Sequence, residues 1–325
     1  MLQASQLRKT YGAITPVKGL TFSMGEGEVA GLLGVNGAGK STTMRMLSGY
    51  LAPTSGNIVL DGFSMVEDPL RAKALVGYLP ETPPLYPDMT VREQLRFICA
   101  LRSIPARRVR AECDRVASLL NIGHVLNRLN GHLSKGYRQR VGFAAALVGS
   151  PRLVILDEPT SGLDPHQMID IRALIQELTG STSVLISSHV LSEIENVCTR
   201  LLILVEGALV TDGTPADILA AYGKAPRLEL DVLGDARAAE QVLRALLPAD
   251  VTWTRVATAS GEGTGFAIPL SGISVGEERF FAAFAGQNQA LAVTRMVRVL
   301  PTLEEAFLDI TLRASVTDAK KEVSA

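Results

Sequence analysis

The sequence predicts an α/β protein in which a parallel sheet is covered by helices on both sides, followed by a smaller α+β domain. Two observations support this prediction. Short apolar runs that are typical of buried parallel strands alternate with helical segments over residues 1–222. The composition then shifts at AAYGKAPR (220–227), where glycine and proline indicate a boundary between domains.

The length and composition are ordinary for a globular protein of two domains. The chain has 325 residues, of which 47% are hydrophobic and 20% are charged, so it can bury a large core. A formal net charge of −1 does not indicate a nucleic-acid partner, and we expect none. Cys99, Cys113 and Cys198 are widely spaced, which favours a reducing compartment over a disulfide framework or a metal site. We find no signal peptide and no apolar stretch long enough to predict a transmembrane segment.

The first domain carries its strand and helix signals in alternation. Three apolar runs predict buried parallel strands: EVAGLLGV (28–35), RLVILDEP (152–159) and TSVLISSH (182–189). IRALIQELTG (171–180) predicts a helix that ends at Gly180. Residues 85–150 carry apolar side chains at helical spacing, so we expect a helical subdomain inserted into the sheet.

The second domain shows the βαββαβ order of a ferredoxin-like fold. The six segments are RLELDVLG (227–234), ARAAEQVLRALLP (236–248), VTWTRVAT (251–258), GTGFAIPLSG (263–272), VGEERFFAAFAGQ (275–287) and ALAVTRMVRVL (290–300). Thr302 and Glu305 then form a capping-box pattern at the head of a further helix. We expect this domain to cover residues 226–313 and the polar end, 314–325, to be a flexible tail.

A glycine-rich loop follows the first buried strand. GLLGVNGAGKST (31–42) fits the pattern G-x-x-x-x-G-K-[ST] through Gly34, Gly39, Lys40 and Ser41. Glycine lets backbone N–H groups converge on phosphates, lysine supplies a positive charge, and the hydroxyl can bind Mg²⁺. The pattern predicts a nucleoside triphosphate site, which kinases, GTPases, helicases and transport ATPases all possess.

Polar residues at the ends of two later strands suggest the chemistry at this site. Asp157 can reach a Mg²⁺ held by Ser41, and Glu158 can take a proton from a water that attacks the γ-phosphate. The same two acids also fit a helix N-terminus, which attracts negative charge. His189 ends the strand at 182–189, at the sheet edge where α/β proteins bind ligands, although a lone histidine is more often structural.

A serine and a glycine head the helix that begins in LSKGYRQRV (133–141). The hydroxyl of Ser134, the N–H of Gly136 and the helix dipole can together meet an anion. The stretch also fits an ordinary N-cap with a basic helix behind it.

Taken in order, these stretches resemble the nucleotide-binding subunits of ATP-binding cassette (ABC) transporters over residues 2–222. The resemblance implies a P-loop ATPase fold with a RecA-like core, a β-subdomain and a helical insertion. It identifies five motifs in this chain: the Walker A loop GVNGAGKST (34–42), the Walker B strand LVILDE (153–158), the signature LSKGY (133–137), the D-loop SGLD (161–164) and the switch histidine His189.

The resemblance also implies roles for individual residues. Glu158 and His189 are the expected catalytic residues, and Ser41, Glu81 and Asp157 are the expected Mg²⁺ ligands. The residues expected to contact ATP are Tyr11, Gly34, Asn36, Gly37, Ala38, Gly39, Lys40, Ser41, Thr42, Glu81, Ser134, Gly136 and Asp164. Tyr11 would stack on the adenine, although it also fits an exposed tyrosine in a hairpin.

Two departures from the family pattern bear on mechanism. Glu81 stands where most of the family has glutamine, within GYLPETPPLYPDMTV (77–91), the segment that faces the membrane partner. Lys135 and Tyr137 replace a glycine and a glutamine of the commonest signature, LSGGQ. These variants and the ending LEEAFLDIT (303–311) look most like the branch paired with ABC-2-type permeases, which includes gliding-motility, copper-processing and multidrug export ATPases.

The resemblance therefore implies an ATP-hydrolysing subunit that dimerises around two ATP molecules and drives a separate ABC-2-type permease. The expected work of this permease is export of a cargo. We expect it on the cytoplasmic face of the membrane as a homodimer, or as a heterodimer with a second ATPase subunit. The alternatives are a soluble ABC-type ATPase acting on nucleic acid or ribosomes, and a regulatory nucleotide-binding module without turnover. Soluble ATPases of this family carry coiled coils, zinc-binding cysteines or two cassettes in one chain, and we find none of these signals in the sequence. The intact set Asp157, Glu158 and His189 argues against a regulatory module without turnover.

Overall fold

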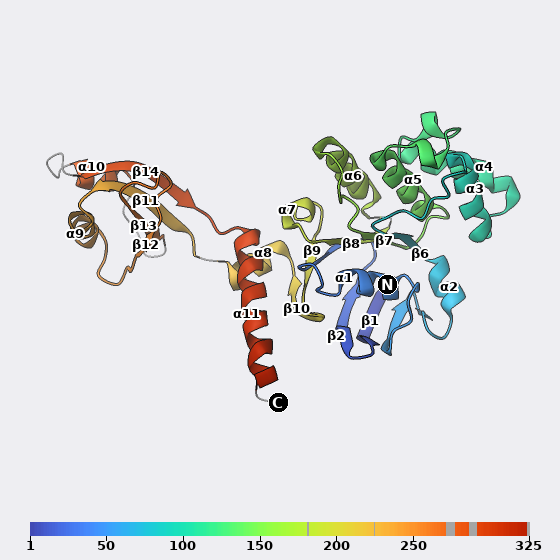
Figure 1. The fold of residues 1–325 in the computed structure, drawn as a ribbon, viewed down its shortest axis with the longest axis horizontal. Coiled ribbons are helices and arrows are strands. Elements are labelled where there is room, and N and C mark those ends of the chain that lie inside the picture. Colours follow the sequence, from blue (N-terminus) through green and yellow to red (C-terminus); the bar gives the residue numbers. More distant parts are fainter. Residues whose placement is uncertain (181, 224, 271–276, 286–290, 324–325) are drawn as a thin grey trace. The chain divides into compact units, whose positions relative to one another are not determined.

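The computed structural model describes the chain apart from residues 181, 224, 271–276, 286–290 and 324–325 (Figure 1). The chain divides into two compact units. They are Met1–Ile218 together with Ile310–Ala325, and Leu219–Asp309. The predicted domain limits, 1–222 and 226–313, stay a prediction.

The first unit begins with an antiparallel sheet of four strands in the order β2-β1-β4-β5. The strands are β1 (Leu2–Tyr11), β2 (Ile14–Met24), β4 (Ser55–Leu60) and β5 (Phe63–Ser64), and helix α2 (Pro69–Ala74) follows them. Buried and exposed residues alternate over much of β1 and β2, because only one face of this sheet packs on the core. This sheet is the expected β-subdomain.

A second sheet has six strands in the order β10-β9-β3-β8-β7-β6. They are β3 (Val29–Leu33), β6 (Val76–Leu79), β7 (Leu153–Asp157), β8 (Ser183–Ser188), β9 (Arg200–Val205) and β10 (Ala208–Gly213). Neighbours from β9 to β6 pair in parallel, and β10 pairs antiparallel with β9. Every residue of β3, β7 and β8 is buried, as expected for strands covered on both faces.

Helices cover both faces of the six-stranded sheet. They include α1 (Lys40–Leu47), α6 (Pro165–Leu178) and α7 (Leu191–Ile194). Helix α8 (Pro215–Tyr222) follows β10. Figure 1 shows α5 and α6 on one side of the sheet and α1 on the other, toward β1 and β2. α6 ends at Leu178, and Gly180 has a φ of +89°, which agrees with the predicted stop.

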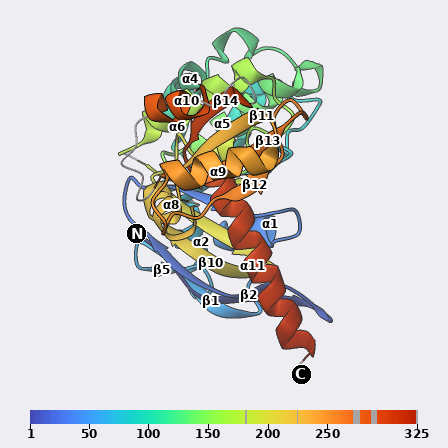
Figure 2. The ribbon, with the colours of Figure 1, turned by 90° about the vertical axis from the view of Figure 1, so that its left-hand side faces the viewer.

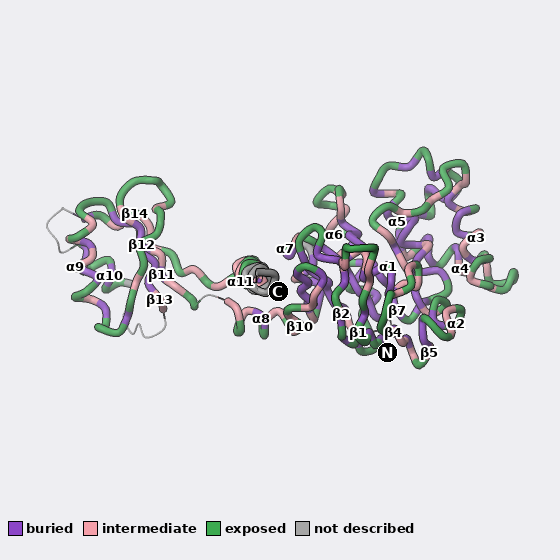
Figure 3. The backbone as a smooth tube through the Cα atoms, turned by 60° about the horizontal axis from the view of Figure 1, so that its bottom comes forward, coloured by how far each residue is buried: buried purple, intermediate pink, exposed green. Residues whose placement is uncertain are grey.

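A hydrophobic core joins the two sheets through α1. Met44 and Leu47 on this helix are fully buried in the same cluster as Leu7 of β1, Leu32 of β3 and Leu185 of β8. Figure 3 shows buried residues in purple in the interior of this unit, near α1 and β7. Because the core holds α1 in place, it also fixes the position of the helix N-terminus, where the glycine-rich loop ends.

The predicted helical insertion lies between β6 and β7. It contains α3 (Val91–Leu101), α4 (Ala106–Leu119), the 3₁₀ turns η1 (Gly123–Val125) and η2 (Asn130–His132), and α5 (Lys135–Leu147). Thr90 and Glu93 form a complete capping box at the start of α3. Cys99 of α3 and Cys113 of α4 are buried free thiols whose sulfur atoms lie 3.9 Å apart.

The second unit has the ferredoxin-like topology that the sequence predicts. Its elements are β11 (Arg227–Gly234), α9 (Ala236–Leu246), β12 (Thr254–Val256), β13 (Thr264–Pro269), α10 (Glu277–Ala285) and β14 (Leu291–Val299). The strand order β12-β13-β11-β14 is antiparallel throughout, and α9 lies in front of the strands in Figure 2. Leu230 of β11, Leu243 of α9 and Phe280 of α10 are fully buried in its core. Only part of the predicted strand 251–258 pairs, and residues 271–276 and 286–290, which flank α10, lie outside the described part of the chain.

The chain ends with a long helix, α11 (Leu303–Val323). The hydroxyl of Thr302 accepts a hydrogen bond from the backbone N–H of Glu305, as the capping pattern predicts. The Glu305 carboxylate instead pairs with Arg227, 3.2 Å away, so the reciprocal half of the box is replaced by an ion pair. The structure continues this helix to Val323, beyond the start of the predicted flexible tail at residue 314, and the flexibility of the tail stays a prediction. Across the ranges that the structure describes, no helix is long and apolar enough to cross a membrane.

Candidate active site

The glycine-rich loop connects the end of β3 to the start of α1. A side chain on Gly34 would place its Cβ 2.6 Å from the carbonyl oxygen of Leu204, and one on Gly39 would collide with the carbonyl oxygen of Pro16. Gly37 and Gly39 also have φ angles of +85° and +98°, which favour glycine. The loop is therefore pressed against its neighbours in a conformation that other residues would not adopt.

Lys40 is the first residue of α1 and is 6% exposed. Its ammonium group donates a hydrogen bond to the carbonyl oxygen of Gly34 at 2.8 Å and lies 3.5 Å from a carboxylate oxygen of Glu158. The first turn of α1 carries no acidic residue and no side-chain cap. The N-terminus of the helix thus presents its N–H groups and a buried cation to the same space, which is the arrangement that binds phosphate.

Asp157 is the last residue of β7 and is 2% exposed. One of its carboxylate oxygens accepts hydrogen bonds from the hydroxyl of Ser41 at 3.2 Å and from the hydroxyl of Ser187 at 2.6 Å. Ser187 also accepts a hydrogen bond from the backbone N–H of Glu158 at 2.9 Å. A single serine on β8 therefore positions both acids.

The sequence analysis did not single out Ser187. The residue lies opposite Asp157 in the parallel pairing of β7 with β8, and this register is what brings the two side chains together. The only signal in the sequence is its place two residues before His189 at the end of an apolar strand.

Glu158 lies between two potential cations. One of its carboxylate oxygens is 3.5 Å from Lys40, and the other is 2.6 Å from Nδ1 of His189. Glu158 has a φ of +50°, which is uncommon for a residue other than glycine, and it is 8% exposed. The His189 side chain is 44% exposed, so this side of the carboxylate opens toward solvent.

These residues share one cleft of about 530 Å³, a volume typical of a small-molecule site. The lining residues are Pro16, Asn36, Gly37, Gly39, Lys40, Ser41, Thr42, Glu81, Glu158 and His189. Gly34 and Ala38 do not line the cleft but hold the loop in place. The carbonyl oxygen of Gly34 accepts a hydrogen bond from Lys40. The backbone N–H of Ala38 donates a hydrogen bond to Val35, and its carbonyl oxygen accepts one from Gly207. Pro16 is a lining residue that the sequence analysis missed.

The donor set of the cleft fits a nucleoside triphosphate with Mg²⁺. The positive φ angles of Gly37 and Gly39 let the backbone of the loop turn so that its N–H groups can converge on phosphate. The Ser41 hydroxyl, the Asp157 carboxylate and the Glu81 carboxylate supply hard oxygen ligands, which Mg²⁺ prefers.

Comparisons with known proteins agree with this geometry. Residues 17–161 match the family model described as ABC transporter. The linearmycin resistance ATP-binding protein LnrL of Bacillus subtilis is 36% identical over 236 residues, which are 72% of this chain and 76% of the relative. The chain belongs to the ABC transporter ATP-binding proteins.

Other relatives and solved structures support the assignment. The Nod factor export ATP-binding protein I of Paraburkholderia xenovorans is 36% identical over 68% of this chain and 73% of its own length. The bacitracin transport ATP-binding protein BcrA of Bacillus licheniformis is 36% identical over 65% of this chain and 69% of its own length. A structure of the ATP-binding subunit of an ABC transporter is 30% identical, with a TM-score of 0.63 over 68% of this chain and 93% of that one. This chain is accordingly an ABC ATPase, and ATP is its nucleotide.

Besides Gly34 and Ala38, which form the loop itself, four residues expected to contact ATP do not line the cleft of this ABC ATPase. Tyr11 lies at the turn between β1 and β2, is 51% exposed, and has the ammonium of Lys9 5.2 Å from its ring centroid. Ser134 is the N-cap of α5, where it accepts a hydrogen bond from the N–H of Tyr137. Gly136 is buried in α5, and Asp164 is the N-cap of α6.

The signature helix α5 is joined to the D-loop region that follows the Walker B strand. The side-chain amide of Gln139, which is buried, donates a hydrogen bond to the carbonyl oxygen of Pro159 at 3.1 Å. Gly136 packs so closely on Gln167 of α6 that a Cβ on Gly136 would collide with the Gln167 side chain. The ammonium group of Lys135 likewise occupies the position that a Cβ on Gly162 would need. The departure at Lys135 therefore contacts the D-loop within its own chain.

A second, largely apolar cavity of about 230 Å³ lies beside the segment that carries Glu81. Its lining residues come from β6, the stretch after β6, α3, α5 and the end of α1, and include Leu79, Pro84, Leu85, Ile98 and Leu101. Tyr78 also lines it. Burial, with a smaller contribution from the Asp157 carboxylate, raises the pKa of Tyr78 to about 12, so its phenol stays neutral. This cavity connects the Glu81 segment to the helical insertion.

Proposed function

We propose that this ABC ATPase drives export through an ABC-2-type permease, as a peripheral subunit on the cytoplasmic face of the membrane. The printed names of relatives support export: they describe bacitracin transport, Nod factor export and linearmycin resistance. The observation that carries the proposal is the position of Glu158, held between Lys40 and His189 in the cleft that the Walker A loop forms. A carboxylate placed there can take a proton from water beside the γ-phosphate.

Each residue of the cleft has a proposed task. The N–H groups of the loop and the ammonium of Lys40 bind the phosphates, and Ser41, Asp157 and Glu81 hold Mg²⁺. When bound, Mg²⁺ neutralises charge that develops on the phosphate oxygens. Glu158 takes the proton of the attacking water. His189 is then placed to orient Glu158 through the 2.6 Å contact.

We propose that ATP is bound between two subunits, in a homodimer or in a heterodimer with a second ATPase. Ser134, Gly136 and Asp164 do not line the cleft of their own chain, so in this proposal they contact the ATP bound by the other subunit. Ser134 suits this role because its hydroxyl and the N-terminus of α5 face the same side. Tyr11 is proposed to stack on the adenine of the ATP bound in its own chain, because its ring is half exposed.

The apolar cavity beside Glu81 is the proposed contact for the permease. Its lining joins the Glu81 segment to α3 and α5, so pressure from a docked segment would reach both the cleft and the signature helix. This arrangement supports coupling between ATP turnover and movement of the permease.

Co-purification tests the proposal. The chain is co-expressed with the product of a neighbouring gene, chosen because its sequence predicts several transmembrane helices, and the complex is isolated from membranes in detergent. We expect retention of the wild type and weaker retention of Leu101→Asp, a variant of an exposed lining residue. Leu70→Asp, an exposed leucine on α2 outside the cavity, is the matched control. Equal retention of both variants would contradict the docking site, and a membrane protein that never co-purifies would contradict the transporter pairing.

A further inference from the structure

The second unit contains a cavity of about 530 Å³ that is separate from the ATP cleft. It lies between helix α9, the turn after it, and the chain leading into β12. Its lining residues are Glu240, Arg244, Leu247, Pro248, Ala249, Val251, Thr252 and Trp253. The volume is within the range of about 300–1,000 Å³ for small-molecule sites.

One end of this cavity is apolar. Leu247 and Val251 are 6% and 8% exposed and belong to the core of the unit, against which Trp253 packs with part of its surface exposed. The backbone N–H of Val251 donates a hydrogen bond to the carbonyl oxygen of Pro248, which closes the turn. Because the core and this bond hold the turn in place, the apolar wall is preformed.

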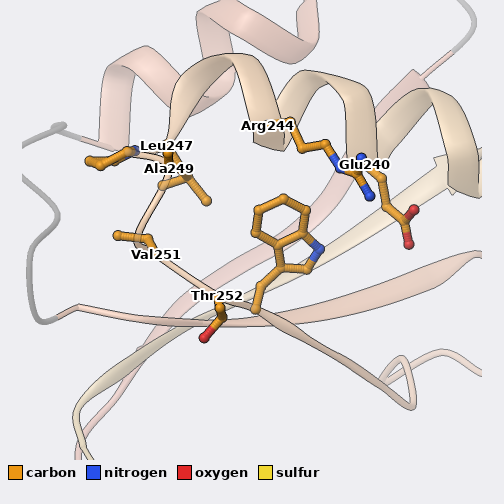
Figure 4. Close-up of a pocket in the computed structure, with 8 residues that line it drawn as sticks. Glu240, Arg244, Leu247, Ala249, Val251 and Thr252 are labelled. Carbon is orange, nitrogen blue, oxygen red and sulfur yellow. The ribbon is translucent and has the colours of Figure 1, made fainter.

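The other end of the cavity is charged. Figure 4 shows the side chains of Glu240 and Arg244 together at one end and Leu247, Ala249 and Val251 at the other. One carboxylate oxygen of Glu240 accepts two hydrogen bonds from Arg255, at 2.9 and 2.7 Å. Arg244 is exposed and, within the described part of the chain, makes no ion pair.

The balance of charge therefore favours an anion at this end. Glu240 is already paired with Arg255, which lies outside the lining, so Arg244 is the lining cation whose charge a ligand can meet. A guanidinium is well suited to bind a carboxylate through two parallel hydrogen bonds. An apolar body beside Trp253 would place a carboxylate at the end of the cavity where Arg244 lies.

We propose that this cavity is a binding site for a small apolar monocarboxylate. The apolar body packs between Trp253 and the turn Leu247–Val251, and the carboxylate pairs with Arg244. The site gives the second unit a ligand of its own, independent of ATP.

The chain offers a direct reporter, because Trp253 is its only tryptophan. Adamantane-1-carboxylate, which does not absorb in the near ultraviolet, is titrated into the full-length protein while the emission of Trp253 is recorded. Adamantane-1-carboxamide and 1-adamantylamine have the same apolar body without the negative charge. We expect a saturable change in emission with the carboxylate, about fivefold weaker binding of the carboxamide, and the weakest binding of the amine, since an exposed ion pair contributes up to about 1 kcal/mol.

Two variants distinguish binding at this cavity from nonspecific hydrophobic binding. Arg244→Gln should weaken binding of the carboxylate by about fivefold and leave binding of the carboxamide nearly unchanged. Arg237→Gln, an exposed arginine at the start of the same helix and outside the lining, is the matched control and should bind as the wild type does. Circular dichroism checks that both variants remain folded. The proposal is overturned if no saturable change occurs, if the amine binds as tightly as the carboxylate, or if Arg244→Gln leaves carboxylate affinity unchanged.

Discussion

Replacing Glu158 by glutamine should separate ATP binding from ATP hydrolysis. The amide has nearly the shape of the carboxylate, so it preserves the packing of a side chain that is 8% exposed and lies 2.6 Å from His189. It removes the negative charge 3.5 Å from Lys40 and the basic oxygen that would take a proton. The Mg²⁺ ligands proposed for the cleft, Ser41, Asp157 and Glu81, are unchanged.

The expected loss of turnover is large. General-base catalysis contributes about 10²–10⁴-fold to a rate, which corresponds to about 3–5 kcal/mol in the activation barrier. ATP affinity should stay equal or rise for two reasons. Lys40 loses the ion pair with Glu158 and can interact fully with the phosphates, and the negative charge of Glu158 no longer repels the γ-phosphate. Because ATP then persists, the variant should accumulate as an ATP-dependent dimer.

The assay is steady-state phosphate release, with ATP affinity measured separately and the dimer followed by size-exclusion chromatography. Glu26→Gln is the matched control, since its side chain is 70% exposed and lies outside the cleft. The control should turn over ATP at the wild-type rate. If Glu158→Gln retains turnover within about fivefold of wild type, a loss far smaller than removal of a general base causes, Glu158 is not the base.

Three further predictions follow from the same structure. Lys40→Ala should weaken ATP binding itself by at least about tenfold, because a buried phosphate charge loses its cation; unchanged affinity in a nucleotide-binding assay would contradict the phosphate cradle. Glu81→Gln should change turnover only modestly, whereas Glu81→Ala should raise the Mg²⁺ concentration needed for half-maximal turnover; identical Mg²⁺ titrations for Glu81→Ala and wild type would remove Glu81 from the metal site. Burial raises the pKa of Cys198 from 9.0 to about 12. Cys198 should therefore resist iodoacetamide at about pH 8 in the folded protein and react in urea. The contribution of its neutral thiol to the free energy of unfolding should be present below pH 9 and decline as pH rises toward 12. Rapid labelling of Cys198 in the folded protein, measured by mass spectrometry, would contradict this prediction.

Much of the fold could be predicted because local signals agree with the tertiary structure. The apolar run of β7 is buried along its whole length, and helix α6 ends next to Gly180, as the sequence indicates. Local signals are incomplete at the end of the chain. Its polar residues gave no helix signal beyond residue 313, and the structure continues α11 to Val323. The carboxylate of Glu305 likewise prefers Arg227 to the helix N-terminus, a partner 78 positions away that a local pattern does not reveal.

The sequence by itself determined the chemical identity of the cleft. The glycines, Lys40 and Ser41 are adjacent in the chain, so one short stretch is enough to specify a phosphate loop, and the paired acids at the end of β7 follow from one apolar strand. Only the tertiary structure decided which distant groups complete it. Ser187 reaches Asp157 through the register between β8 and β7, His189 reaches Glu158 across the same edge, and Ser134 and Gly136 lie outside the cleft of their own chain. Such contacts depend on how strands pair and how a helical insertion folds back, and these are long-range packing choices that leave no local pattern in the sequence.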